Sequence, residues 1–87
     1  SLTLVLPPAL RLLRTGGQAL ILVKPQCELS QSEVGKGGIV RAPALYAGVE
    51  RKVFDVAQHC RLTVKAWLNS PITGGDGNRE FFIWLKK

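Results

Sequence analysis

Residues 18–24 read Gln-Ala-Leu-Ile-Leu-Val-Lys, with Gly16-Gly17 before them and Pro25 after them. The run is apolar without alternation, which is typical of a strand buried on both faces of a parallel sheet. Proline cannot donate a hydrogen bond to a strand ladder, so Pro25 marks the end of the strand. The glycine pair favours the end of a helix, because glycine readily takes the left-handed conformation found there. This stretch predicts an α/β sheet with a helix before its first strand.

The segment before the glycines is apolar, with Leu6, Leu10 and Leu13 at helical spacing. Prolines are tolerated in the first turn of a helix, and the residue before a proline is pushed away from the helical region. Since Leu6 precedes Pro7, we expect a helix over residues 7–14 and a separate turn before it.

The rest of the chain predicts a long loop over residues 26–41, a helix from residue 43 to residue 60, and strands at 62–68 and 80–85. The helix is indicated by apolar residues every three or four positions, namely Leu45, Val49, Val53, Val56, Ala57 and Cys60. A glycine-rich connection at 69–79, with turn residues at 74–78, joins the last two strands most simply as an antiparallel hairpin. The order is helix, strand, helix, strand, strand. It predicts an α/β fold with a right-handed crossover and a free edge on the first strand, through which the chain is expected to self-associate.

The chain has 87 residues, enough for one small domain, and 46% of them are hydrophobic, which argues against disorder. Twelve lysines and arginines against six acidic residues give a net charge of +6, which suits an anionic partner. Cys27 and Cys60 do not have metal-ligand spacing, so we expect no metal and a reduced, cytoplasmic protein. No apolar run approaches the ~20 residues of a membrane span.

Two charged residues stand where strands end. Lys24 follows the first strand, and Glu80 opens the last one directly after the glycine-rich connection. If the hairpin lies beside the first strand, both residues reach the same sheet edge and face one site. The alternative is that each is an ordinary solvated charge at a strand end.

The run Gly35-Lys36-Gly37-Gly38 invites comparison with a phosphate-binding loop, but the P-loop pattern requires glycine at 30 and serine or threonine at 37. Lys36 and Arg41 still suit contacts with phosphates, because the glycines allow close backbone approach. A flexible solvated loop is the alternative interpretation.

Three motifs occur in order along the chain: VKPQCE at 23–28, VGKGGIVR at 34–41, and SPITG at 70–74 followed by GNREF at 77–81. Together they resemble the TlyA-type family of FtsJ-like ribosomal RNA 2′-O-ribose methyltransferases, often labelled hemolysins. In that family an S4-like RNA-binding domain precedes a Rossmann-like methyltransferase domain. Residues 1–87 resemble the second half of the latter, which implies the C-terminal portion of an S-adenosylmethionine methyltransferase sheet, ending in an antiparallel last strand.

The resemblance also implies site residues and partners. The family surrounds the ribose hydroxyl with a Lys-Asp-Lys-Glu tetrad, of which Lys24 matches the third member and Glu80 the fourth. The other two members, and the glycine-rich segment that binds S-adenosylmethionine, would precede Ser1. Ribosomal RNA or ribosomal subunits are the implied partners, with Lys36, Arg41 and Arg79 as candidate RNA contacts, and the isolated chain is expected to be inactive.

Two other functions stay open from the sequence. A non-catalytic, basic RNA-binding module would bind RNA with a steep salt dependence and would not need Lys24. Membrane lysis is suggested only by the hemolysin label, and no segment is long or amphipathic enough to favour it.

Overall fold

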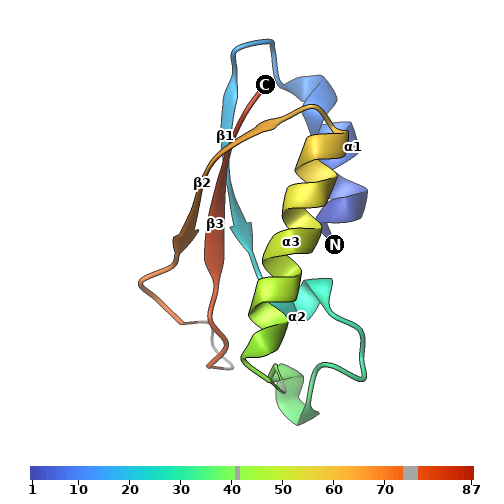
Figure 1. The fold of residues 1–87 in the computed structure, drawn as a ribbon, viewed down its shortest axis with the longest axis vertical. Coiled ribbons are helices and arrows are strands. Elements are labelled where there is room, and N and C mark those ends of the chain that lie inside the picture. The colour runs from blue at the N-terminus through green and yellow to red at the C-terminus, as the bar shows by residue number, and fades with distance from the viewer. Residues whose placement is uncertain (41, 74–76) are drawn as a thin grey trace.

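In the described part of the chain, three strands form one sheet in the order β1-β3-β2, so the strand that comes last in the sequence lies in the middle (Figure 1). The computed structural model describes residues 1–40, 42–73 and 77–87. In chain order the elements are α1 (Leu2–Leu12), β1 (Gln18–Val23), α2 (Pro25–Glu28), a 3₁₀ turn η1 (Lys36–Gly38), α3 (Ala44–His59), β2 (Thr63–Asn69) and β3 (Phe81–Lys86). Both β1 and β2 run antiparallel to β3. The α/β fold, the crossover helix and the final hairpin are thereby confirmed, while residues 74–76 of the predicted turn lie outside the described residues.

The core lies between the sheet and the two longer helices, which pack on the same face of it (Figure 1). Successive side chains of a strand point to opposite faces, so β3 buries alternate residues, and Ile83 at its centre is fully enclosed. The buried apolar side chains are Leu2, Leu6, Val23, Val49, Val53, Ala57, Leu62, Phe81, Ile83 and Leu85. Because Val49, Val53 and Ala57 are the buried face of α3, the spacing predicted for this helix is confirmed.

Helix α1 differs from the prediction, since it runs from Leu2 to Leu12 with Pro7 and Pro8 inside it. The expected start at residue 7 and the separate turn before it are wrong. Each proline removes a donor from the helix and disfavours the helical region for the residue before it. Burial outweighs these effects, because Leu2 and Leu6 lie one turn apart and are only 9% and 1% exposed.

The end of α1 is joined to the end of the chain. The Lys87 ammonium donates hydrogen bonds to the carbonyls of Leu10, at 3.0 Å, and Leu13, at 2.6 Å. The backbone of Lys87 also exchanges hydrogen bonds with Gly16 and Gly17, at 2.8 and 2.9 Å. These contacts satisfy carbonyls that a helix leaves unpaired at its last turn.

Strand β1 is buried on one face only, which corrects the prediction of burial on both. Val23 and Ile21 face the helices, whereas Leu20 is 62% and Leu22 39% exposed on the other face. The neighbouring Trp84 of β3 is 38% exposed on that same face. Apolar composition alone could not reveal this, because α1 and α3 both cover one face and no described residue covers the other. The predicted edge position of β1 is confirmed by the strand order.

The segment predicted as a long loop is partly ordered. It begins with the short helix α2, contains the turn η1, and forms a two-residue bridge between Val34 and Val40. The prediction that β1 ends at Pro25 is confirmed. Pro25 is also the first residue of the helix α2, a position where proline is tolerated.

Candidate active site

Lys24 and Glu80 meet at one edge of the sheet. The antiparallel register of β1 and β3 ends with Val23 opposite Phe81, so Lys24 and Glu80 are the next residues on the two strands. The backbone at Lys24 is extended, with φ −104° and ψ 105°, and the carbonyl of Glu80 accepts a hydrogen bond from Ser70 at 2.8 Å. Strand alternation therefore continues through both residues and places them on the side opposite the core. The predicted juxtaposition is present in the structure.

Their side chains carry opposite charge but do not bond to each other. Lys24 is exposed and Glu80 is half-buried. Within residues 1–40, 42–73 and 77–87, no hydrogen bond or ion pair joins the two side chains. Lys24 is also the N-cap residue of α2, but its side chain makes no capping hydrogen bond. Both groups are thus available to a third molecule at this edge.

Asn78 ties the glycine-rich loop to the strand that carries Glu80. Its side chain accepts a hydrogen bond from the N–H of Val40, at 2.9 Å, and donates one to the carbonyl of Gly38, at 2.6 Å. Asn78 is 2% exposed and both hydrogen bonds are partly buried, so their loss is costly. Gly37 has φ +79°, a conformation that favours glycine. The loop is held beside the Lys24–Glu80 edge, which the sequence did not predict.

The three predicted RNA contacts, Lys36, Arg41 and Arg79, differ in their surroundings. Lys36 is exposed at the start of η1, on the loop that Asn78 holds. Arg41 lies outside the described residues. The guanidinium of Arg79 lies over the rings of Tyr46 and Phe81, 5.3 Å from each ring centroid. Arg79 is thus a positioned side chain, while Lys36 is a solvated one.

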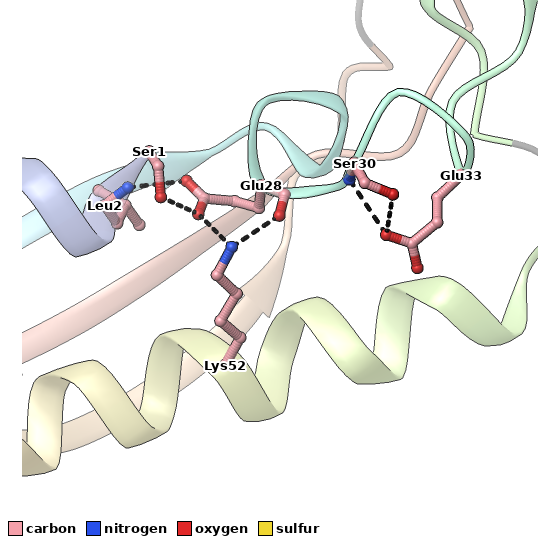
Figure 2. Close-up of polar contacts among 6 residues, drawn as sticks. All are labelled: Ser1, Leu2, Glu28, Ser30, Glu33 and Lys52. Atoms are coloured by element: carbon pink, nitrogen blue, oxygen red, sulfur yellow. Dashed lines mark hydrogen bonds and ion pairs between the residues drawn. The ribbon is translucent and has the colours of Figure 1, made fainter.

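Glu28, the last residue of α2, joins three helices beneath the site (Figure 2). Its carboxylate accepts hydrogen bonds from the N–H of Leu2 and the hydroxyl of Ser1, both at 2.9 Å. Lys52 of α3 approaches the same carboxylate at 3.9 Å and donates a hydrogen bond to the carbonyl of Glu28 at 2.8 Å. The Glu28 side chain is only 4% exposed, so a buried carboxylate is compensated by these partners.

A second carboxylate in the same region, that of Glu33, belongs to a half-buried residue. Ser30 donates hydrogen bonds to Glu33 from its N–H, at 3.0 Å, and from its hydroxyl, at 2.8 Å (Figure 2). These two bonds lower the pKa of Glu33, because they favour the charged carboxylate. They close the turn that leads from α2 into the glycine-rich loop.

Sequence reasoning missed Glu28, Asn78 and Tyr46. Glu28 and Asn78 occur inside the quoted motifs, and that was the available signal. Their roles depend on contacts between residues 26 to 40 positions apart, which no local pattern encodes.

One cavity in the described part of the chain lies apart from Lys24 and Glu80. This cavity of about 540 Å³ lies between α1 and α3, where Arg51, Lys52 and His59 are among its lining residues. Its lining includes neither Lys24 nor Glu80, and it has no glycine-rich turn. Among the described residues there is no group of three His, Cys, Asp or Glu side chains that could hold a metal ion. None of the described helices is long and apolar enough to cross a membrane.

Comparison with known proteins identifies relatives of the whole chain. Residues 1–87 match the sequence model of the family described as "FtsJ-like methyltransferase". The chain is 44% identical over 85 residues to "Putative rRNA methyltransferase YqxC" of Bacillus subtilis (strain 168), covering 98% of this chain and 30% of that protein. It is 38% identical over 90 residues to "16S/23S rRNA (cytidine-2'-O)-methyltransferase TlyA" of Mycobacterium tuberculosis (strain ATCC 25618 / H37Rv), covering 99% of this chain and 32% of that protein.

Two solved structures share the fold. One is described as "a putative hemolysin from Lactococcus lactis", with a TM-score of 0.92 and 40% identity over 98% of this chain and 40% of that one. The other, "Putative hemolysin from Streptococcus thermophilus", has a TM-score of 0.93 and 41% identity over 100% of this chain and 31% of that one. This chain thus spans about a third of the length of the curated relatives it matches.

The strand order and the crossover helix, with their close match to these structures, define an α/β fold of the methyltransferase class. The match over residues 1–87 then gives the family: the chain belongs to the FtsJ-like methyltransferases. The resemblance to TlyA-type proteins inferred from the three motifs is confirmed.

Proposed function

We propose that the chain is the second half of the methyltransferase domain of a longer protein that methylates a ribose 2′-hydroxyl of ribosomal RNA. The observation that carries the proposal is the neighbouring position of Lys24 and Glu80 at one sheet edge. The names of the relatives supply the substrate class, since both are described as rRNA methyltransferases.

Each of the two residues has a chemical role. A ribose hydroxyl is a weak nucleophile, and removal or polarisation of its proton activates the oxygen. In the proposed mechanism the Nζ atom of Lys24 polarises or accepts this proton. The Glu80 carboxylate accepts a hydrogen bond from Lys24 or from the sugar and fixes their mutual orientation, and much of the rate enhancement comes from such positioning.

Substrate binding falls to basic residues around this edge. Lys36 and Arg41 contact RNA phosphates from the glycine-rich loop, and Arg79 contacts RNA beside Glu80. Phosphate contacts of this kind give binding that weakens as salt rises. Asn78 supports this role because it holds the loop next to the strand that carries Glu80.

The remainder of the protein completes the site. We propose that it binds S-adenosylmethionine, the methyl donor that the resemblance implies, and that it supplies the first two members of the tetrad. The isolated 87-residue chain is therefore inactive, and it self-associates through the free edge of β1. The working place of the full-length protein is the cytoplasm, where ribosomal RNA is found.

The experiment measures methyl transfer from labelled S-adenosylmethionine to ribosomal subunits by the full-length protein, by Lys24→Ala and by Lys65→Ala. Lys65 is an exposed lysine in β2 and serves as the matched control. We expect Lys24→Ala to lose at least about a hundredfold in rate, within the range of general acid–base effects, and Lys65→Ala to stay active. Equal activity of Lys24→Ala and the unaltered protein would contradict the catalytic role. RNA binding without any methyl transfer would favour the non-catalytic module, and transfer by the isolated chain would refute its proposed inactivity.

A further inference from the structure

The guanidinium of Arg79 lies against two aromatic side chains. Its guanidinium carbon is 5.3 Å from the centroids of both the Tyr46 and the Phe81 rings, which contact each other edge-on at 5.8 Å. Behind Phe81 lies Trp67, stacked at 5.0 Å with an interplanar angle of 23°. The aromatic cluster is therefore continuous from the core to the surface, and the guanidinium is its outermost layer.

Polar contacts also fix the orientation of this side chain. The Nη2 atom of Arg79 donates a hydrogen bond to Oδ1 of Asn69 at 2.7 Å. The backbone N–H of Arg79 donates to the Tyr46 hydroxyl at 3.2 Å. In the described part of the chain no carboxylate forms an ion pair with Arg79. The guanidinium is thus held by neutral groups, and the residue remains exposed.

A cavity of about 310 Å³ opens beside the guanidinium. Its lining combines ring faces with hydrogen-bonding groups and comprises Pro43, Tyr46, Ala47, Glu50, Trp67, Asn69, Arg79 and Phe81. Unpaired RNA bases are recognised by this combination, because they stack on aromatic rings or guanidinium planes and use donors and acceptors at their edges. A phosphate contact alone would need no such lining.

The cavity lies on the opposite side of the strand from the proposed reaction centre. Arg79 rests on Phe81, which faces the core, so alternation places Glu80, between them, on the other side. A base on Arg79 is therefore a different base from that of the nucleotide whose ribose faces Lys24 and Glu80.

We propose that the Arg79 guanidinium, supported by Tyr46 and Phe81, is the stacking site for an unpaired base adjacent to the methylated nucleotide. This inference rests on the proposed function and adds to it a contact that determines substrate choice. It assigns Arg79 to a base, whereas Lys36 and Arg41 remain phosphate contacts.

The test compares binding of the full-length protein to a ribosomal RNA fragment over a range of salt concentrations, using Arg79→Lys, Arg79→Ala and Tyr46→Leu. Lysine keeps the charge but has no plane on which a base can stack. We expect Arg79→Lys and Tyr46→Leu to bind about tenfold more weakly than the unaltered protein, with an unchanged salt dependence. Arg79→Ala should lose similar affinity with little change in the slope of log K against log salt, because that slope follows contacts with phosphates, and a fall of about 0.7 would instead mark Arg79 as a phosphate contact. Arg51→Lys, at an exposed position of α3 that does not line the Arg79 cavity, is the matched control and should bind normally.

A fluorescent base analogue, 2-aminopurine, placed next to the methylated position gives a direct reading of stacking. The quenching of 2-aminopurine fluorescence when the protein binds the RNA should be smaller for Arg79→Lys than for the unaltered protein. Full affinity and full quenching in Arg79→Lys would overturn the proposal and leave Arg79 as a phosphate contact. Methyl transfer by the unaltered protein is measured in parallel. Its absence would refute the proposed function, whereas normal transfer with an unaffected Arg79→Lys would refute only the stacking site.

Discussion

Glu28 and Lys87 lie at opposite ends of α1, and each satisfies backbone groups that the helix leaves unpaired. The Glu28 carboxylate accepts the N–H of Leu2, and the Lys87 ammonium donates to the carbonyls of Leu10 and Leu13. A negative charge at the first turn and a positive charge at the last also complement the helix dipole. A helix with two internal prolines is thus stabilised by residues from distant parts of the chain.

Replacing Glu28 by alanine should destabilise the protein. The change removes the cap of α1 and leaves Lys52 without its carboxylate, and loss of a helix cap costs about 1 kcal/mol. Lys52 is 43% exposed, so solvent screens the ion pair and it adds little. We expect the free energy of unfolding to fall by about 1–2 kcal/mol in urea denaturation.

Glu33→Gln is the control for Glu28→Ala, because Glu33 is a carboxylate on the next turn whose hydrogen-bond partner is Ser30. It should change the unfolding free energy much less. An equal loss in both variants would show that α1 does not depend on the Glu28 cap.

Replacing Asn78 by alanine should release the glycine-rich loop from the sheet edge. The backbone groups of Gly38 and Val40 would lose their partners, at a cost of about 1–3 kcal/mol or roughly ten- to hundredfold in local opening. The measurement is hydrogen exchange at the Val40 amide. The Ile83 amide in β3 is an internal reference, and a similar acceleration there would mean global unfolding instead of loop release.

Replacing Leu20 by lysine should weaken self-association of the isolated chain. Leu20 is 62% exposed on the uncovered face beside the free edge of β1, so a charge there opposes pairing with little effect on stability. Leu12→Lys makes the same change at a 91% exposed position on α1 and should leave association intact. Sedimentation velocity decides the matter, and a strictly monomeric unaltered chain at high concentration would contradict the prediction.

Glu33 should titrate below its ordinary pKa in the folded protein, because Ser30 donates to its charged form. A depressed pKa means that the contact stabilises the folded state above the pKa of the unfolded chain. That stabilisation is lost as the pH falls through the lowered folded value. Carboxyl NMR titration should show that Ser30→Ala raises the pKa of Glu33, while Ser32→Ala does not, since Ser32 makes no bond to Glu33. Equal values in all three proteins would refute this account.

Sequence patterns predicted the elements whose periodicity is local. The spacing of Val49, Val53 and Ala57 marked α3, and the glycine-rich connection marked the hairpin of β2 and β3. The pairing of β1 with β3, which the sequence analysis could state only as a condition, brings Lys24 and Glu80 to one edge, because the register of an antiparallel sheet fixes which strand ends meet.

The remaining features depend on contacts that are distant in sequence. The start of α1 at Leu2 is stabilised by the hydrogen bond to Glu28 and by the burial of Leu6. Neither contact is visible in the local sequence, where the two prolines argue against a helix. Arg79 was flagged by its charge alone, but its orientation comes from Tyr46 on another element. Exposure of one face of β1 follows from where the helices pack, which apolar composition does not encode.

The central position of β3 has a consequence for biosynthesis. Gln18 of β1 pairs with Lys86, and Thr63 of β2 pairs with the same residue. Neither strand can pair with β3 until the ribosome has released residues 81–86, so β1 waits for this partner while the 57 residues between β1 and β3 are made. Pairings of such long sequence separation also form slowly. A premature stop codon only a few positions upstream of residue 81 would remove the strand on which both β1 and β2 pair, and such a product would be a target for chaperones and proteases.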